Sequence, residues 1–243
     1  MSVLDHFFAT EPIVKSFRIA RIAAAFAPIY ALALIIALAH SAAAKPRPNS
    51  QPQPLPQAAA PAAIQLEVAP GTKATYRVKE QLAGLNFPDD AVGSTETVSG
   101  SLVLLPDGSF DPAKSKLVFD LRDLKSDQDM RDGYVKGRTL ETDKFPNAEF
   151  VPKKITGVAF PLPAPDRPTG QTGFQIAGDL TIHGVTKPVT LDGYATYSKD
   201  TLAGRALASF TFATFCLTKP TLARLLSVDD TINLDIQFKL KRN

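Results

Sequence analysis

Apolar and polar side chains alternate strictly near the C-terminus, and this alternation constrains the fold more than any other feature of the chain. The run TINLDIQFKLK covers residues 231–241. Its large apolar members occupy every second position: Ile232, Leu234, Ile236, Phe238 and Leu240. Because successive side chains of a β-strand point to opposite faces of a sheet, the run predicts a strand with one buried and one solvated face.

Seven further segments carry the same period of two, and turn sequences such as PDGS at 106–109 separate them. They cover residues 73–82, 97–105, 116–124, 148–154, 174–182, 188–197 and 206–215. Eight amphipathic strands predict an all-β antiparallel fold, either a sandwich or a closed barrel. Closure removes exposed strand edges, so we expect an eight-stranded barrel, which is either filled by its own side chains or holds one small ligand.

One charged segment, 125–150, breaks the alternation and predicts a short helix. Ser126 or Asp127 is suited to cap this helix at its N-terminus. Arg131 is expected to pin the segment to the barrel through a charge-assisted hydrogen bond. A second short helix is expected at 219–227, where a proline stands near the first turn.

The N-terminal part, residues 1–44, differs from the rest of the chain. Basic residues precede an uncharged apolar stretch at 22–39, and a small-residue A-x-A pattern follows it, which is the order of a secretory signal peptide. Because about 18–20 apolar residues also span a bilayer, an uncleaved anchor that associates with the membrane is the alternative. The stretch 45–63 is rich in proline and alanine and predicts an extended spacer. We therefore expect a folded domain at 64–243 that is exported, either periplasmic or secreted.

Composition and charge exclude few function classes, but they argue against nucleic-acid binding. The net charge is only +3, and the 21% of charged residues form no dense basic run interleaved with aromatic residues. Cys216 is the only cysteine, so no disulfide can form within the chain. It lies in the apolar run FTFATFCL, and we expect it to be buried as a small hydrophobic residue.

His183 is the only histidine after the first 44 residues, so neither a multi-histidine metal site nor another cofactor is expected in the folded domain. The residue lies between two predicted strands and is followed by Gly184, which accepts the positive φ of a tight turn. No G-x-S-x-G elbow accompanies it. We interpret His183 as a turn residue with a structural hydrogen bond, and we expect no enzymatic activity. A hydrolase that uses His183 is the alternative.

Two stretches resemble one known family. MRDGYVKGRTLETDKFPNAEF, residues 130–150, resembles the R-D-x-H-L … F-P-x-x-x-F segment of YceI-like proteins, with Tyr-Val where His-Leu is usual. GDLTIHGVTKPVTL, residues 178–191, is similar to the most recognisable run of that family. The resemblance implies a lipocalin-like barrel that carries a polyisoprenoid or similar long-chain lipid in its interior, and it implies no catalytic residues.

The candidate ligand contacts are large apolar residues on the predicted inner face of the strands. They are Phe119, Leu121, Phe150, Leu180, Ile182, Leu191, Phe210, Phe212, Ile236 and Phe238. The same residues would pack together as an ordinary core if the barrel were filled. A filled barrel that acts as a structural or interaction module of the cell envelope is therefore the second hypothesis.

Overall fold

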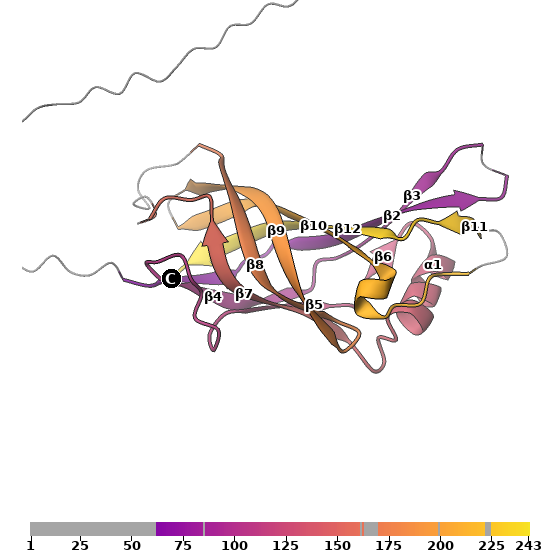
Figure 1. Ribbon diagram of the computed structural model, residues 1–243, viewed down its shortest axis with the longest axis horizontal. Helices are drawn as coiled ribbons and strands as arrows, with labels where there is room; N and C mark the ends of the chain where they lie inside the picture. Colours follow the sequence, from indigo (N-terminus) through magenta and orange to yellow (C-terminus); the bar gives the residue numbers. More distant parts are fainter. Residues whose placement is uncertain (1–61, 85, 161, 163–169, 199, 222–224) are drawn as a thin grey trace, which may run out of the picture. The chain divides into compact units, whose positions relative to one another are not determined.

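Twelve antiparallel β-strands form one sheet that closes on itself in the part of the chain that the structure describes (Figure 1). The computed structural model describes residues 62–84, 86–160, 162, 170–198, 200–221 and 225–243. The strands are β1 (Ile64–Val68), β2 (Lys73–Leu82), β3 (Asp89–Thr95), β4 (Val98–Leu104), β5 (Lys116–Asp120), β6 (Lys125–Ser126), β7 (Asn147–Thr156), β8 (Thr172–Ile182), β9 (Val185–Ser198), β10 (Thr201–Thr211), β11 (Leu225–Val228) and β12 (Thr231–Arg242).

Eight positions surround the barrel, because three of them are each filled by two successive strands. β1 and β2 pair one after the other with the same edge of β12. β4 and β3 then pair with β1 and β2, while β5 and β6 pair with β4 and β3. β7, β8, β9, β10 and β12 complete the circle. The predicted eight-stranded antiparallel barrel is confirmed, and the pairing of β1 with β12 excludes an open sandwich.

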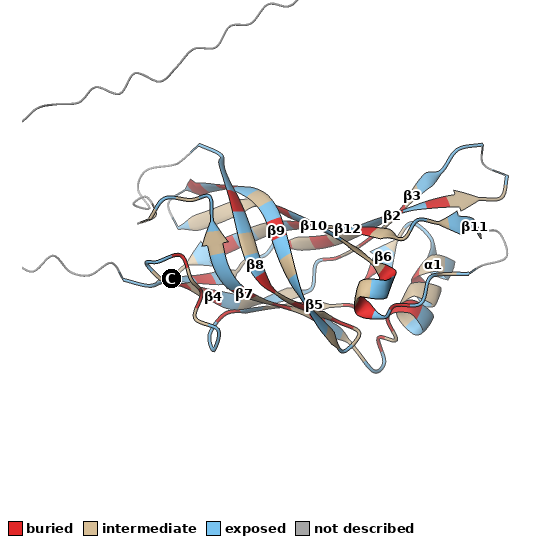
Figure 2. Ribbon diagram, viewed as in Figure 1, coloured by how far each residue is buried: buried red, intermediate tan, exposed pale blue. Residues whose placement is uncertain are grey.

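Each of the eight predicted segments overlaps a strand, and the alternation within it sets which side chains face inward. In β12, Ile232, Ile236 and Leu240 are buried while the polar residues between them are more exposed. Figure 2 shows the same change from buried to exposed positions along the barrel strands. The inward side chains form two hydrophobic clusters, a larger one that contains Phe119 and a smaller one that contains Leu104.

The predicted first helix exists, but its expected cap is wrong. α1 (Asp129–Tyr134) begins after Gln128, which makes no side-chain cap, and the π-helix η1 (Val135–Thr139) follows directly. Ser126 and Asp127 do not cap the helix because they bind other partners. The Ser126 hydroxyl donates to Asp132 at 2.6 Å, and the Asp127 carboxylate accepts from Arg131.

The predicted second helix is wrong where the structure describes it. Residues 225–228 form β11, which pairs with β2. The neighbouring β12 pairs with β2 only as far as Arg77, so the remainder of that edge, up to Leu82, is free to accept another strand. The hydrogen-bonding demand of this edge overrides the local helical pattern.

A short 3-10 helix, η2 (Phe212–Phe215), follows β10 and gives Cys216 an unexpected position. The Thr211 hydroxyl caps this helix, and Cys216 ends it in the left-handed region with φ of 55°. The thiol side chain is exposed, so the predicted burial is wrong. The end of the strand at Thr211 shifts the alternation that predicted an inward cysteine.

Helices long and apolar enough to cross a bilayer are absent from the described ranges. The predicted signal or anchor at 1–44 and the spacer up to residue 61 lie outside these ranges.

Candidate ligand-binding cavities

The interior of the barrel contains two cavities with no lining residue in common. The large cavity has a volume of about 920 Å³ and lies at the end of the barrel that carries α1 and β11. The small cavity has a volume of about 270 Å³ and is lined by β1, by β4 and by the C-terminal half of β12. Along β12 the boundary between the two cavities falls between Leu234, which lines the large cavity, and Ile236, which lines the small one.

All ten residues predicted as candidate ligand contacts lie on the wall of one of these cavities. Six of them line the large cavity: Phe119, Leu121, Leu180, Ile182, Phe210 and Phe212. Four line the small cavity: Phe150, Leu191, Ile236 and Phe238. The sequence therefore identified the inner face, whereas contact of these residues with a ligand stays a prediction.

Phe150 lies at the boundary between the two cavities. It lines the small cavity, while Ala148, two residues earlier on β7, and its cross-strand partner Leu180 line the large one. Its ring packs over Gly178 of β8, with Cζ 2.6 Å from the point that a glycine Cβ would occupy. Only 2% of Phe150 is exposed. This ring therefore belongs to the layer that separates the cavities.

Aromatic rings elsewhere on the inner face also lie against glycines of the neighbouring strand. Tyr76 of β2 pairs with Gly93 of β3, and two ring atoms and the hydroxyl of the tyrosine lie 2.4–2.8 Å from the position of a Cβ at that glycine. Phe238 of β12 lies in the same way over Gly204 of β10, with Cζ at 2.7 Å. These two rings therefore lie over the neighbouring strand, Tyr76 in the wall of the large cavity and Phe238 in the wall of the small one.

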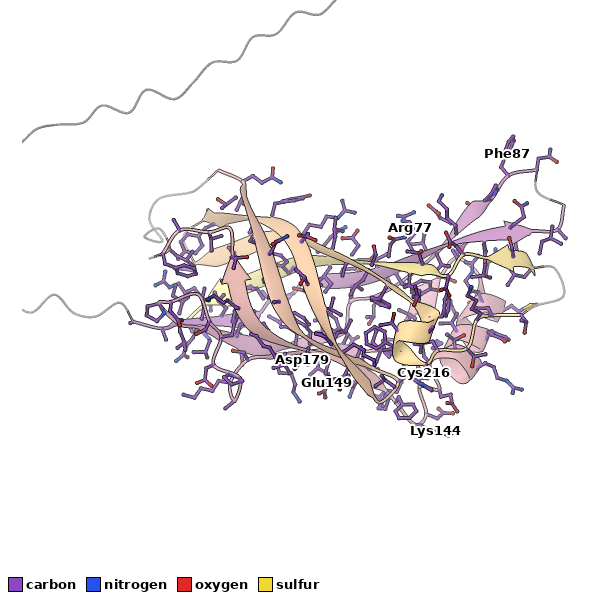
Figure 3. The ribbon with its side chains drawn as sticks, in the orientation of Figure 1. Arg77, Phe87, Lys144, Glu149, Asp179 and Cys216 are labelled. Atoms are coloured by element: carbon purple, nitrogen blue, oxygen red, sulfur yellow. The ribbon has the colours of Figure 1, made fainter. Side chains whose placement is uncertain are left out.

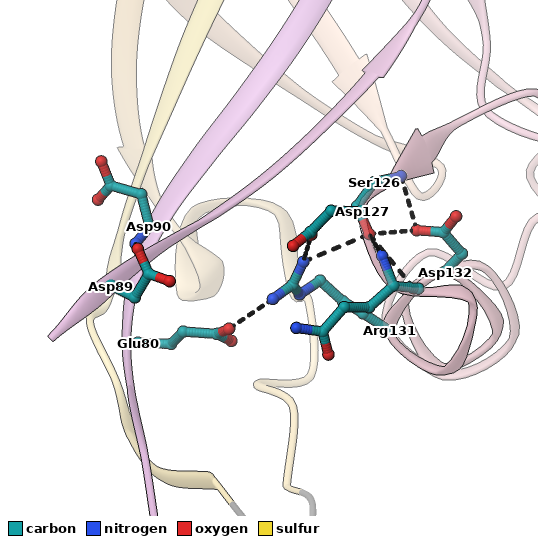
Figure 4. A network of polar contacts seen from close by, with 8 residues as sticks. Glu80, Asp89, Asp90, Ser126, Asp127, Arg131 and Asp132 are labelled. Carbon is teal, nitrogen blue, oxygen red and sulfur yellow. Dashed lines mark hydrogen bonds and ion pairs between the residues drawn. The ribbon is translucent and has the colours of Figure 1, made fainter. Parts of the chain in front are cut away.

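Polar side chains gather at one end of the large cavity, next to α1 (Figure 4). The Arg131 guanidinium of α1 donates through Nη2 to Glu80 Oε1 of β2 at 2.6 Å, and it also donates to Asp127. The side chains of Arg131 and Glu80 are only 11% and 10% exposed. The predicted attachment of this segment to the barrel by Arg131 is confirmed. The sequence reading missed its partner, although Glu80 continues the inward alternation of Tyr76 and Val78.

Tyr76 reaches the same polar region from within the cavity. Burial raises the pKa of its phenol to about 12, and the nearby Arg131 opposes this shift in pKa only in part. The phenol therefore stays protonated and can donate a hydrogen bond at neutral pH. Together with Glu80 and Arg131 it makes the end of the large cavity near α1 polar, whereas most of the remaining wall is apolar.

The lining of the large cavity includes the exposed residues Gly84 and Met130, so the cavity reaches solvent at the end formed by α1, β11 and the connection from β2 to β3, which we call its mouth. Leu82, Gly84, Met130, Tyr134 and Leu225 line it. The Tyr134 hydroxyl accepts a hydrogen bond from the Thr221 backbone N–H at 3.3 Å, which ties α1 to the segment that leads to β11.

His183 lies in the two-residue turn between β8 and β9, outside both cavity linings. Its φ is 52°, and that of Gly184 is 73°. Its Nε2 lies 2.7 Å from Glu141 Oε2, and its ring packs edge-on against Phe145 with the centroids 4.6 Å apart. The imidazole thus holds the loop after η1 against the β8–β9 turn, as expected for a structural histidine. Clusters of three or more His, Cys, Asp or Glu side chains able to hold a metal ion do not occur within the described ranges.

Comparison with known proteins places this barrel among similar chains. A family model described as "YceI-like domain" matches residues 70–240. A UPF0312 protein of Vibrio campbellii is 30% identical over 128 residues, or 50% of this chain and 57% of that protein. One from Vibrio vulnificus is 31% identical over 139 residues, or 55% of this chain and 63% of the relative. This chain therefore aligns with less than two thirds of the length of these curated relatives.

Two solved structures share the fold at low sequence identity. A polyisoprenoid-binding domain from Saccharophagus degradans, described as implicated in plant cell wall breakdown, superposes with a TM-score of 0.57 at 16% identity, covering 74% of this chain and 98% of that one. BcnA of Burkholderia cenocepacia superposes with a TM-score of 0.51 at 18% identity, covering 71% and 98%. At these identities the likeness concerns the fold.

Proposed function

The chain belongs to the YceI-like family, whose model matches residues 70–240, and we propose that its barrel binds a polyisoprenoid or another long-chain lipid. The observation that carries the proposal is the large cavity of about 920 Å³, lined mainly by apolar side chains. A volume of this size lies at the upper end of the range of volumes found for small-molecule binding sites. A domain from Saccharophagus degradans with this fold is described as polyisoprenoid-binding, which supports the ligand class.

The distribution of polar groups favours an amphiphile with its head group next to α1. Each methylene that enters the apolar part of the cavity contributes about 0.8 kcal/mol. The head group would lie beside Tyr76, Glu80 and Arg131, where hydrogen-bonding partners are available. The tail would extend along Phe119 and Leu180 toward the layer that contains Phe150.

The charges at this end favour a head group that is not anionic. Arg131 is already paired with the carboxylates of Glu80 and Asp127, and Asp132 adds a third carboxylate to the network. An additional anion there would face an excess of negative charge without a free guanidinium. An uncharged head group, such as an alcohol, carbonyl or amide, meets a phenol donor and carboxylate acceptors instead.

The two other function classes have less support. A filled structural barrel would pack its centre with its own side chains, whereas this barrel contains a cavity of about 920 Å³. An enzyme that uses His183 would need its imidazole to face a substrate, but the ring binds Glu141 and Phe145 outside both cavities. We therefore assign a binding function without catalysis.

The cellular role follows from the predicted export. A signal peptide or anchor at 1–44 would deliver the barrel to the periplasm or the cell exterior, where it would carry or store its lipid or respond to stress.

The experiment is native mass spectrometry and lipid extraction on protein purified from its own cell envelope. Wild type is expected to retain a long-chain lipid. Ala148→Phe should lose this lipid because Ala148 lines the large cavity, and the added ring would occupy it. Ala195→Phe is the matched control, since it is buried to the same extent but lines the small cavity. Circular dichroism and urea unfolding verify that both variants fold, since overpacking costs about 1–3 kcal/mol.

Absence of lipid from the wild type, together with failure to bind added solanesol, would overturn the proposed function. Equal lipid content in all three folded proteins would show that the ligand does not occupy the large cavity.

A further inference from the structure

The most exposed large apolar side chains of the described residues are Phe87, Met130 and Leu226, with 78%, 78% and 67% of their surface exposed. Leu207 and Tyr194 come next at 43% and 40%, and they lie on the outer wall formed by β10 and β9. Exposed apolar groups gathered in one place mark an interaction site, whereas scattered ones do not. The location of Phe87, Met130 and Leu226 therefore decides whether they mark an interaction site.

These three side chains come from the three segments that form the mouth of the large cavity. Phe87 lies in the connection from β2 to β3, after Leu82 and Gly84 of the lining, and Figure 3 shows it at the tip of this hairpin. Met130 belongs to α1 and lines the cavity itself. Leu226 follows Leu225 of the lining in β11, which pairs with β2. We call Phe87, Met130 and Leu226 the apolar rim.

We infer that the apolar rim docks on the surface of a lipid bilayer and inserts its side chains there, so that the large cavity opens toward the membrane. The inference rests on the proposed function in one respect: a long-chain lipid is sparingly soluble in water and has to reach the cavity from a lipid phase. A rim of apolar side chains around an apolar cavity lets the tail pass from bilayer to barrel without crossing water.

The charges beside the rim indicate which kind of bilayer it fits. Asp89, two positions after Phe87, and Asp129, next to Met130, are both exposed. These carboxylates gain nothing from anionic lipids, so insertion would depend mainly on the apolar side chains. Docking on phosphatidylcholine vesicles is therefore expected, and added salt should not weaken it, because salt screens only charge-driven binding.

The chain contains no tryptophan, so a single introduced indole reports on one site without background. The full-length Phe87→Trp protein is titrated with phosphatidylcholine vesicles, with and without brominated acyl chains. Its emission should shift to the blue by about 10 nm or more and be quenched by the brominated lipid. Leu207→Trp is the matched control: it also replaces an exposed apolar residue, but on the outer wall, and its emission should not change. The control also separates insertion of the rim from any attachment of the vesicle through residues 1–44.

Two results would overturn the docking inference. One is identical emission of Phe87→Trp with plain and brominated vesicles. The other is a blue shift without vesicles that grows with protein concentration, which would assign the rim to contact with a second copy of the chain. Neither result touches the proposed function, because lipid extraction and solanesol binding are measured separately.

The consequence for lipid uptake is tested with Phe87→Ser combined with Leu226→Ser, since neither residue lines the cavity. Transfer of solanesol from phosphatidylcholine vesicles should slow at least tenfold, while loading from detergent micelles stays at the wild-type level. Leu207→Ser should transfer at the wild-type rate. Equal transfer rates in all three proteins would show that the rim is not the route of entry.

Discussion

Phe150 offers the sharpest test of how the barrel selects its ligand, because its ring belongs to the layer between the two cavities. The ring of this nearly fully buried residue packs over Gly178. Phe150→Leu replaces the aromatic ring with a smaller apolar side chain. We expect the variant to open the large cavity of about 920 Å³ to the small one of about 270 Å³.

The magnitude follows from the depth available to an alkyl tail. In wild type, affinity for straight-chain alcohols should rise about fourfold per added methylene, which corresponds to about 0.8 kcal/mol. The rise should stop once the tail reaches Phe150. In Phe150→Leu it should continue into the small cavity, so that two further methylenes improve affinity about fifteenfold over wild type. The cost in stability should be about 1–3 kcal/mol, typical of a shortened core side chain.

The assay is competition of an alcohol series against a fluorescent fatty alcohol, with urea unfolding to verify the fold. Phe110→Leu is the matched control, because Phe110 is buried and lines the small cavity but belongs to the smaller hydrophobic cluster, whereas Phe150 belongs to the larger one. It should lose comparable stability and keep the wild-type chain-length limit. The reasoning fails if Phe150→Leu shows the same limit as wild type, or if wild type shows no limit across the series.

Three further predictions concern the contacts that hold the site in place. Arg131→Met should lower the free energy of unfolding by about 3 kcal/mol, because it leaves the buried Glu80 without its partner; a loss within error of zero in urea unfolding would contradict this. His183→Ala should bind solanesol as wild type does, while its melting temperature should fall. Loss of binding in a folded variant would indicate that His183 belongs to the ligand-binding site. The pKa of Glu141 is lowered by its hydrogen bonds from Lys144 and then His183, so this carboxylate stabilises the fold fully above about pH 4.3 and less as pH falls through the lowered pKa. The difference in stability between wild type and Glu141→Gln should accordingly be constant at neutral pH and vanish in acid, and a difference that persists in acid would refute it.

The strands that the sequence predicts are those whose alternation involves large apolar residues. β3 (Asp89–Thr95) escaped prediction because its inward residues are small or polar, such as Ala91 and Gly93. β11 escaped because its four residues carry no period of their own. Its conformation depends on the free edge of β2, which is a property of the assembled sheet. Local pattern thus predicts most strands that bury large side chains, although it missed β1, in which Ile64, Leu66 and Val68 alternate with polar residues.

Some features of the candidate site could likewise be predicted from the sequence, whereas others could not. Alternation identifies inward residues such as Leu180 and Ile236, but it cannot place them in different cavities, because the boundary depends on which side chains meet across the barrel. The inward position of Glu80 could have been predicted from the sequence, since Glu80 continues the inward series of Tyr76 and Val78 in β2. A carboxylate on an apolar inner face requires a buried partner. Arg131, already expected to attach its helix to the barrel, was the candidate for that role.

The pairing of aromatic residues with glycines helps to explain why a barrel with 11 phenylalanines in residues 64–243 is not filled by them. An inward ring would normally project toward the axis, because a Cβ on the neighbouring strand prevents it from lying flat against the wall. At Gly93 a Cβ would meet ring atoms of Tyr76, at distances down to 2.4 Å, and no other group is as near. Glycine therefore allows this ring to lie along the sheet; at Gly204 the ring of Phe238 is also close, but the backbone oxygen of Tyr194 is closer still, at 2.1 Å. Such pairs are known to stabilise strongly curved sheets. Here such a pair has a second consequence, because the ring of Tyr76 lines the large cavity and lies against β3. Gly93 thus helps to shape the wall of the large cavity, together with the apolar residues that line it.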